Sequence, residues 1–179
     1  PELCFALVAY RDRGDAFFVR VQDFAADLGA IQSALDGLRA GGGGDYPEAF
    51  NEALHVAVHR LSWRGEGTAR LLIPVADAPP QRGRGGPWYD EDALGAAARG
   101  IKLLPVGASG LDRLGETVMR QLAQFTGGRF VFLTYADPRH PQAGPGRRTA
   151  HEVGPYTVES LDELVVRLVS EELARWPRG

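Results

Sequence analysis

Three aspartates, each at the end of a different predicted element, are the residues best placed to do chemistry in this 179-residue chain. Asp12 follows an apolar run, Asp45 follows the four glycines of GGGGDYPEAF (41–50), and Asp77 closes ARLLIPVAD (69–77). Carboxylates that converge on one rim repel each other unless a cation lies among them, and oxygen ligands suit a hard cation such as Mg²⁺. These residues therefore predict metal binding, provided that the fold brings them together.

The segments around these aspartates alternate in the way that is typical of an α/β fold. Apolar or β-branched runs predict strands at 4–10, 16–21, 69–76, 101–107 and 129–135, and helical spacing of apolar residues predicts helices at 27–40, 47–61, 90–99 and 111–125. The first two strands are too close in sequence for a parallel crossover, so they should form a hairpin. Pro74 and Pro105 fall inside predicted strands, which argues for an edge or a strand end at each.

The chain is expected to form one domain over residues 1–179. Residues 136–155, rich in proline and glycine, predict an irregular loop, and 156–176 should close the fold as a strand and a helix. The helix start SLDE (160–163) has the spacing of a capping box.

Chain direction is the reason to expect the three aspartates at one end of the sheet. If the first strand runs upward, the second returns, the helix at 27–40 climbs to the glycines, and the strand at 69–76 delivers Asp77 to the same end. Open α/β sheets bind their ligands along the carboxyl ends of their parallel strands. The glycines would allow the backbone to approach a bound ion or partner without side chains in the way.

The glycine segment also has an interpretation that requires no function. Gly41 could cap the helix before it, while Asp45 and Glu48 could form a reciprocal capping pair at the start of the next helix. This interpretation leaves residues 42–44 unexplained. Locally, Asp77 could equally be a turn residue before two prolines, and Asp12 is more simply a hairpin residue paired with a neighbouring arginine.

His55 and His59, spaced by four residues, resemble a zinc-binding face together with Glu48 and Glu52. All four lie opposite the apolar stripe of their helix, however, which favours a solvated face over a metal site. HVAVH also lacks the glutamate of the metalloprotease motif. No serine or histidine has the sequence context of a nucleophile, so the chain is not expected to be an enzyme.

The composition of the chain argues against nucleic acid and membranes as binding partners. The net charge is −3 and the basic residues are scattered, which argues against nucleic acid. No apolar run reaches the roughly 20 residues of a membrane span, and no signal peptide is evident. The chain is therefore expected to be soluble, with the cytoplasm slightly favoured and the compartment otherwise open.

Five segments in order, FALVAYRDRGD, LRAGGGGDYPEAF, LLIPVADAPP, GIKLLPVG and TGGRFVFLTY, resemble a von Willebrand factor type A (VWA) domain of the kind common in bacterial proteins. The likeness covers residues 4–135, and the closing helix fits it as well. It implies a Rossmann-like, doubly wound, mostly parallel sheet with one antiparallel edge strand. It also implies a metal-ion-dependent adhesion site, where Mg²⁺ accepts a carboxylate from a partner protein.

The resemblance implies a ligand role for Asp77, which matches the family's third-loop aspartate. The threonine expected in the second loop aligns near Gly44, which leaves Asp45 as the nearest oxygen donor. Asp12 and Pro79 would line the partner-binding rim with three residues of the glycine run, Gly42, Gly43 and Gly44.

The chain departs from the family at its front, because it begins at what would be the second strand and contains no Asp-x-Ser-x-Ser motif. The missing strand would lie between those at 4–10 and 69–76, so we expect upstream sequence or another chain to fill that position. Metal binding by this chain alone should be weak or absent.

The resulting prediction is a non-enzymatic protein-interaction module that recognises an acidic side chain of a partner through Mg²⁺. Two alternatives remain: a Mg²⁺-dependent hydrolase or nucleotide-binding enzyme, and a metal-free scaffold within a larger assembly.

Overall fold

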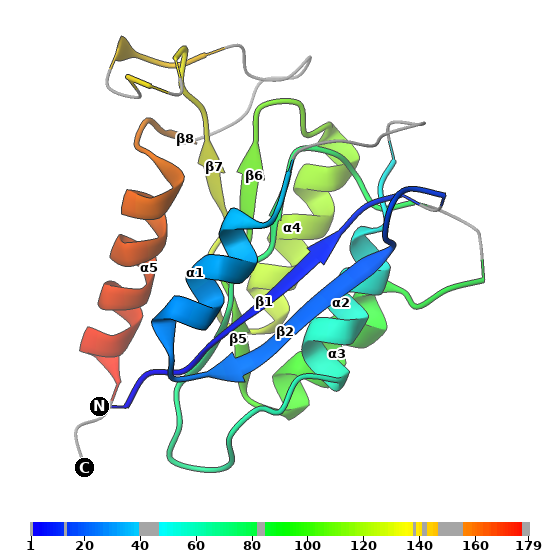
Figure 1. The fold of residues 1–179 in the computed structure, drawn as a ribbon. Helices are drawn as coiled ribbons and strands as arrows, with labels where there is room; N and C mark the ends of the chain where they lie inside the picture. Colours follow the sequence, from blue (N-terminus) through cyan, green and yellow to red (C-terminus); the bar gives the residue numbers. More distant parts are fainter. Residues whose placement is uncertain are drawn as a thin grey trace.

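The structure, a computed structural model, describes residues 2–12, 14–39, 47–81, 85–137, 139–140, 143–146 and 156–176. Its α/β architecture combines parallel sheets with one antiparallel pair of strands (Figure 1). The elements in chain order are β1 (Phe5–Tyr10), β2 (Val19–Ala25), α1 (Leu28–Asp36), α2 (Phe50–His59), β3 (Arg70–Leu72), β4 (Val75–Ala76), α3 (Tyr89–Ala98), β5 (Ile101–Leu103), β6 (Val106–Ala108), α4 (Arg113–Phe125), β7 (Val131–Leu133), β8 (Tyr156–Thr157) and α5 (Leu161–Arg175).

The central sheet is parallel and is interrupted by prolines. Strands β4, β6, β7 and β8 form a four-stranded sheet in that order, and β3 pairs with β5 beside it. Two backbone hydrogen bonds continue the ladder between these pairs, from Leu104 N to Leu72 O at 2.9 Å and from Val106 N to Pro74 O at 2.8 Å. The expected interruptions are confirmed, since β3 gives way to β4 at Pro74 and β5 to β6 at Pro105.

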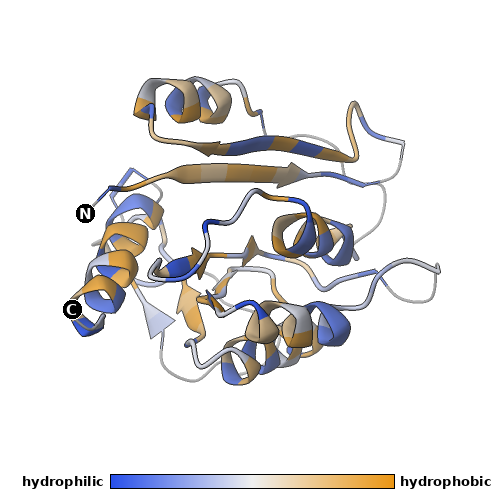
Figure 2. Ribbon diagram, turned by 90° about the horizontal axis from the view of Figure 1, so that it is seen from below, coloured by the Kyte–Doolittle hydropathy of each residue, from blue (hydrophilic) through white to orange (hydrophobic). Residues whose placement is uncertain are grey.

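The predicted hairpin is also confirmed, but it forms a layer of its own. Strands β1 and β2 pair antiparallel, and in the described residues neither pairs with a strand of the parallel sheet. Figure 2 shows this hairpin lying between α1 on its outer side and the rest of the molecule. The coarse α/β class is therefore observed, whereas the predicted hairpin edge within one continuous sheet is not.

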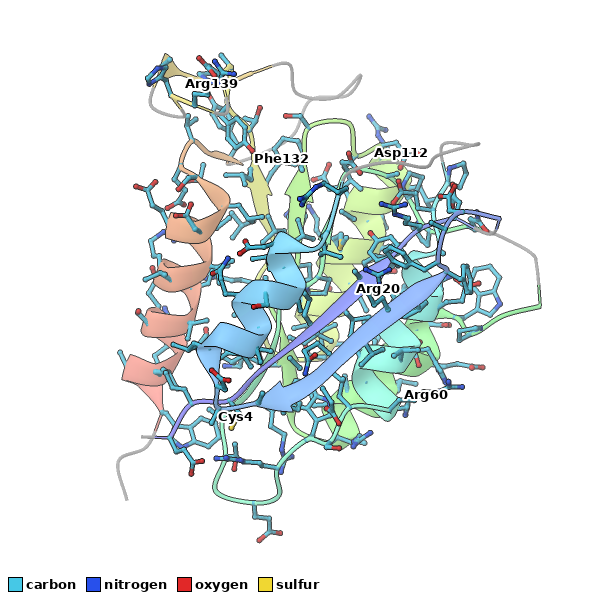
Figure 3. The ribbon with its side chains drawn as sticks, viewed as in Figure 1. Cys4, Arg20, Arg60, Asp112, Phe132 and Arg139 are labelled. Carbon is cyan, nitrogen blue, oxygen red and sulfur yellow. The ribbon has the colours of Figure 1, made fainter. Side chains whose placement is uncertain are left out.

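Two clusters of buried side chains hold the layers together. The larger cluster joins α2, α3 and α4 to the parallel strands, with Phe132 of β7 fully buried in it. Figure 3 shows Phe132 on its strand, within the body of the molecule. The smaller cluster packs Leu164 and Leu168 of α5 against β6 and β7, and both leucines are 0% exposed. The capping box predicted at the start of α5 is present between Ser160 and Glu163.

Two helix boundaries around the glycine run differ from the prediction. Helix α1 ends at Asp36 with Gly37 as its cap, so Gly41 does not end that helix. Helix α2 begins at Phe50, and its N-cap Ala49 makes no side-chain hydrogen bond. The capping pair of Asp45 and Glu48 is therefore wrong as an account of the start of α2.

None of the helices in the described part of the chain is long and apolar enough to cross a membrane.

Candidate functional site at the carboxyl ends of the strands

Three chain segments meet where β1 and β4 end: the residues after β1, those before α2, and those after β4. Glu48 N donates to Pro79 O at 2.9 Å, and Gln81 N donates to Glu48 O at 2.9 Å. Glu48 and Pro80 thus form an isolated parallel bridge. This short ladder fixes the start of α2 against the segment that follows Asp77.

The side chain of Gln81 ties the third segment to the other two. Its Nε2 donates to Asp12 Oδ1 at 3.0 Å and to Pro47 O at 3.1 Å. Asp12 itself is buried, with 6% of its surface exposed. A buried carboxylate needs such donors because its desolvation is otherwise costly.

Tyr10, the last residue of β1, lies at the centre of this arrangement. Its ring packs edge-to-face on Phe50, with centroids 6.3 Å apart, and its hydroxyl donates to Val75 O at 3.4 Å. Burial raises the pKa of the Tyr10 hydroxyl strongly, and the charges of Glu48, Asp77 and Asp12 raise it further. Tyr10 therefore stays protonated and serves as a neutral donor beneath the carboxylates.

The carboxylates at this end of the molecule are close enough to act on one another. Burial raises the pKa of Glu48, and the negative charges of Asp77, Asp12 and Asp15 raise it further, in that order of effect. These four carboxylates, of Asp12, Asp15, Glu48 and Asp77, are called the acidic rim below. Carboxylates that lie this close disfavour one another's ionisation.

The structure places the residues predicted for this site in different situations. Asp77 is exposed and lies within electrostatic range of Glu48, as does Asp12, so chain direction did bring these two aspartates to the same end. Asp45 and the glycines Gly42, Gly43 and Gly44 lie outside the described residues. Both Asp12 and Pro79 are buried. These two residues therefore expose little surface for direct contact with a partner, and their place in a partner-binding surface stays a prediction.

Sequence reasoning missed Glu48, Tyr10 and Gln81 as members of this site. Glu48 was considered only as a possible capping residue and as part of the zinc-like face of its helix, although it lies in the loop that was expected to carry a ligand. Tyr10 ends the predicted first strand, and Gln81 follows the two prolines after Asp77. Only their closeness in sequence to the predicted site could have indicated them, since all three lie within four residues of Asp12, Asp45 or Asp77.

The turn after β6 passes close to Asp77 because it carries a glycine. Gly110 has φ +118°, and a Cβ atom there would lie 3.1 Å from Asp77 O. A side chain at this position would be strained by the backbone angle and crowded by the Asp77 carbonyl. Gly110 thus holds a fourth segment against the rim.

The acidic rim offers the oxygen donors that a hard divalent cation takes, although among the described residues no three of these carboxylates lie close enough to share an ion in this structure. All of the donors are oxygen atoms, and Asp15 Oδ2 is buried with no hydrogen-bond partner among the described residues. A cation among these carboxylates would replace their repulsion by attraction. Exposed Asp77 and half-buried Glu48 are the side chains best placed to reach such an ion.

Comparison with known proteins leaves the family open. No family model matches the chain, and no curated protein matches it. A crystal structure of an uncharacterized membrane spanning protein from Vibrio fischeri is similar over 97% of this chain and 76% of that chain, at 19% identity and a TM-score of 0.35. So low a TM-score supports no conclusion about fold or function, which must therefore be inferred from the chain's own residues.

Proposed function

We propose that this chain is a protein-interaction module of the VWA type, in which the acidic rim holds a Mg²⁺ ion that accepts a carboxylate from a partner protein. The observation that supports it best is the convergence of four carboxylates from three loops at the carboxyl ends of β1 and β4. When bound, the ion supplies a positive centre for an acidic side chain of the partner.

The residues at the acidic rim have different proposed roles. Asp77 and Glu48 hold the ion, and Asp45 adds an oxygen donor from the loop predicted to carry it. Gln81 positions the Asp12 carboxylate through a hydrogen bond. The Tyr10 hydroxyl stays protonated, so it adds no negative charge next to the carboxylates.

The proposal includes a further strand beside β1. In the described residues β1 pairs only with β2, β3 only with β5, and β4 only with β6, so each has one edge without a strand partner. Unpaired backbone edges favour the addition of another strand. A strand from upstream sequence or from another chain would complete the sheet and bring further metal ligands.

The test is calorimetric titration of Mg²⁺ and Mn²⁺ into the wild-type chain and into Asp77→Ala. We expect weak binding by the wild type and a loss of affinity of at least about tenfold in the variant, because a direct ligand is removed. Asp162→Ala is the matched control, since Asp162 is exposed on α5. Equal affinities in all three proteins would contradict the proposal, and no binding even by a protein that also carries the further strand would favour a metal-free scaffold.

A further inference from the structure

Two histidines of α2 and one aspartate of α3 form a second group of potential metal ligands. His55 Nδ1 and His59 Nε2 each lie 2.9 Å from Asp92 Oδ1. The three ligand atoms lie within 4.8 Å of one another. We call these three residues the histidine cluster.

The histidine cluster corrects the interpretation of His55 and His59 as a purely solvated helix face. The two imidazoles are partly exposed, at 40% and 36% of the side chain, yet both bind the same buried carboxylate. A helix places residues four apart on one face, and here that face meets α3. The histidines therefore have the partner that the sequence did not reveal.

Asp92 is the feature that hydrogen bonding alone does not explain. Its side chain is 2% exposed, and the ion pairs of the described residues give it no lysine or arginine partner. The two imidazoles can each donate to Oδ1, but Oδ2 is buried without a hydrogen-bond partner among the described residues. Burying a carboxylate whose second oxygen has no donor is costly, and a metal ion bound at Oδ1 would offset that cost by neutralising the charge of the group.

Gly95 makes room for the histidine cluster. A Cβ atom at this position of α3 would lie 2.7 Å from His59 Cε1 and 3.1 Å from its Nε2. Glycine within a helix costs stability relative to alanine, so its presence here has a packing reason. The absent side chain is what lets the His59 ring lie across α3 next to Asp92.

We propose that His55, His59 and Asp92 bind a divalent transition-metal ion of the zinc class, which clamps α2 to α3. Two imidazole nitrogens and a carboxylate suit Zn²⁺, which takes ligands at about 2.0–2.1 Å in tetrahedral geometry. Such geometry sets neighbouring ligand atoms about 3.3 Å apart. The two 2.9 Å contacts would therefore have to lengthen slightly, and ligand atoms that lie up to 4.8 Å apart would have to approach one another. The partly exposed imidazoles leave a fourth coordination position for water.

This site differs from the acidic rim in place and in chemistry. Glu48 of the acidic rim lies before α2 begins at Phe50, whereas His59 is the last residue of that helix. Figure 3 shows the next residue, Arg60, at the lower end of α2. Nitrogen ligands favour Zn²⁺ over Mg²⁺, while the rim offers oxygen alone. The two metal sites can therefore be tested independently.

The experiment uses untagged protein that has been treated with a chelator and dialysed. Zn²⁺ is titrated by calorimetry in the presence of excess Mg²⁺, bound zinc is counted by elemental analysis, and Co²⁺ is added as a spectroscopic probe. We expect one zinc ion per chain and a visible Co²⁺ spectrum typical of tetrahedral coordination. His59→Ala should weaken zinc binding by at least about tenfold, because one of three protein ligands is lost.

Two further variants keep the outcome interpretable. His140→Ala removes an exposed histidine from a loop far along the chain and should bind zinc like the wild type. Asp92→Asn keeps the size of the buried side chain and should weaken binding, with thermal unfolding used to check that it folds. Zinc binding that is absent from the wild type, or that is equal in wild type, His59→Ala and His140→Ala, would overturn the proposal. An octahedral Co²⁺ spectrum would do so too.

Discussion

Glu48 holds its proton more tightly in the folded protein than in the unfolded chain, because burial and three neighbouring carboxylates oppose its ionisation. Its stabilising contribution is therefore complete below its ordinary pKa of 4.5 and is lost as the pH rises through the higher folded-state pKa. At neutral pH the ionised Glu48 opposes folding. The contribution of Glu48 to the free energy of unfolding should therefore be larger at acid pH than at neutral pH.

Replacing Glu48 by glutamine tests this account. The glutamine is uncharged at every pH, so it avoids the repulsion that the ionised Glu48 experiences. Glu48→Gln should therefore unfold at a higher temperature than the wild type at neutral pH, and this difference in unfolding temperature should vanish below pH 4.5. Thermal unfolding followed by circular dichroism at both pH values measures it. Glu66→Gln, in an exposed turn, is the control. A variant that is less stable than the wild type at neutral pH would contradict the repulsion between Glu48 and its neighbours.

Single residues also show where sequence reasoning reaches its limit. The sequence could predict that Asp12 and Asp77 lie at the same end of the molecule, because chain direction alone decides at which end of a strand a residue lies. The partner of His55 and His59 could not, because Asp92 is 37 and 33 residues away and reaches them only through the packing of α2 on α3. Distances across packed helices depend on crossing geometry, which a periodic pattern does not specify.

Helix α3 links its own stability to the histidine cluster through Gly95. In Gly95→Ala, the new methyl group should displace the His59 ring, and zinc affinity should fall by at least about tenfold. The stability of the metal-free protein should change by less than about 1 kcal/mol, because better helix propensity offsets the displaced ring. Zinc titration and thermal unfolding of the same samples separate the two effects.

The opposite substitution on the exposed side of α3 is the control. Ala97→Gly should lower stability by up to about 1 kcal/mol and leave zinc affinity unchanged. If Gly95→Ala bound zinc as well as the wild type, His59 would not be a ligand in the position that the structure gives it.

Among the elements, those governed by local chemistry were the predictable ones. Pro74 and Pro105 interrupt their strands because proline lacks the donor that a ladder needs, and Ser160 caps α5 because its hydroxyl reaches the backbone of Glu163. The boundaries near the glycine run failed for a different reason. Glu48 bonds to the segment at 79–81, so a tertiary contact replaces the local capping that its spacing suggested.

The molecule divides into a well-packed body and an outer layer of α1, β1 and β2, in which no helix or strand residue is fully buried. Helix α1 packs against β1 and β2 but has no buried residue, and Leu28 and Leu35 are 61% and 50% exposed. Within the body, by contrast, β6, β7 and α4 contribute many of the fully buried side chains. The apolar stripe of α1 predicted the helix correctly but not its exposure, since periodicity does not reveal how much protein covers a face.

This division predicts two levels of protection against hydrogen exchange. The amides of β1 and β2 should exchange through a local opening whose free energy lies at least about 2 kcal/mol below that of global unfolding, which β6 and β7 should report. The hairpin layer shares no strand pairing with the parallel sheet in the described residues, so it can separate without breaking that sheet. Native-state exchange measured by mass spectrometry or NMR gives both values.

A pair of leucine variants distinguishes local opening from global unfolding. Leu122→Ala, at a position that is 0% exposed, should lower the protection of β6 and β7 by about 2–5 kcal/mol and leave that of β1 and β2 nearly unchanged while local opening dominates. Leu35→Ala, at a half-exposed position of α1, should change only the hairpin layer, by about 0.5 kcal/mol or less. If Leu122→Ala lowered protection equally in both layers, the hairpin would unfold only with the body. Its unpaired edge would then not mark a separate unit to which a further strand could be added.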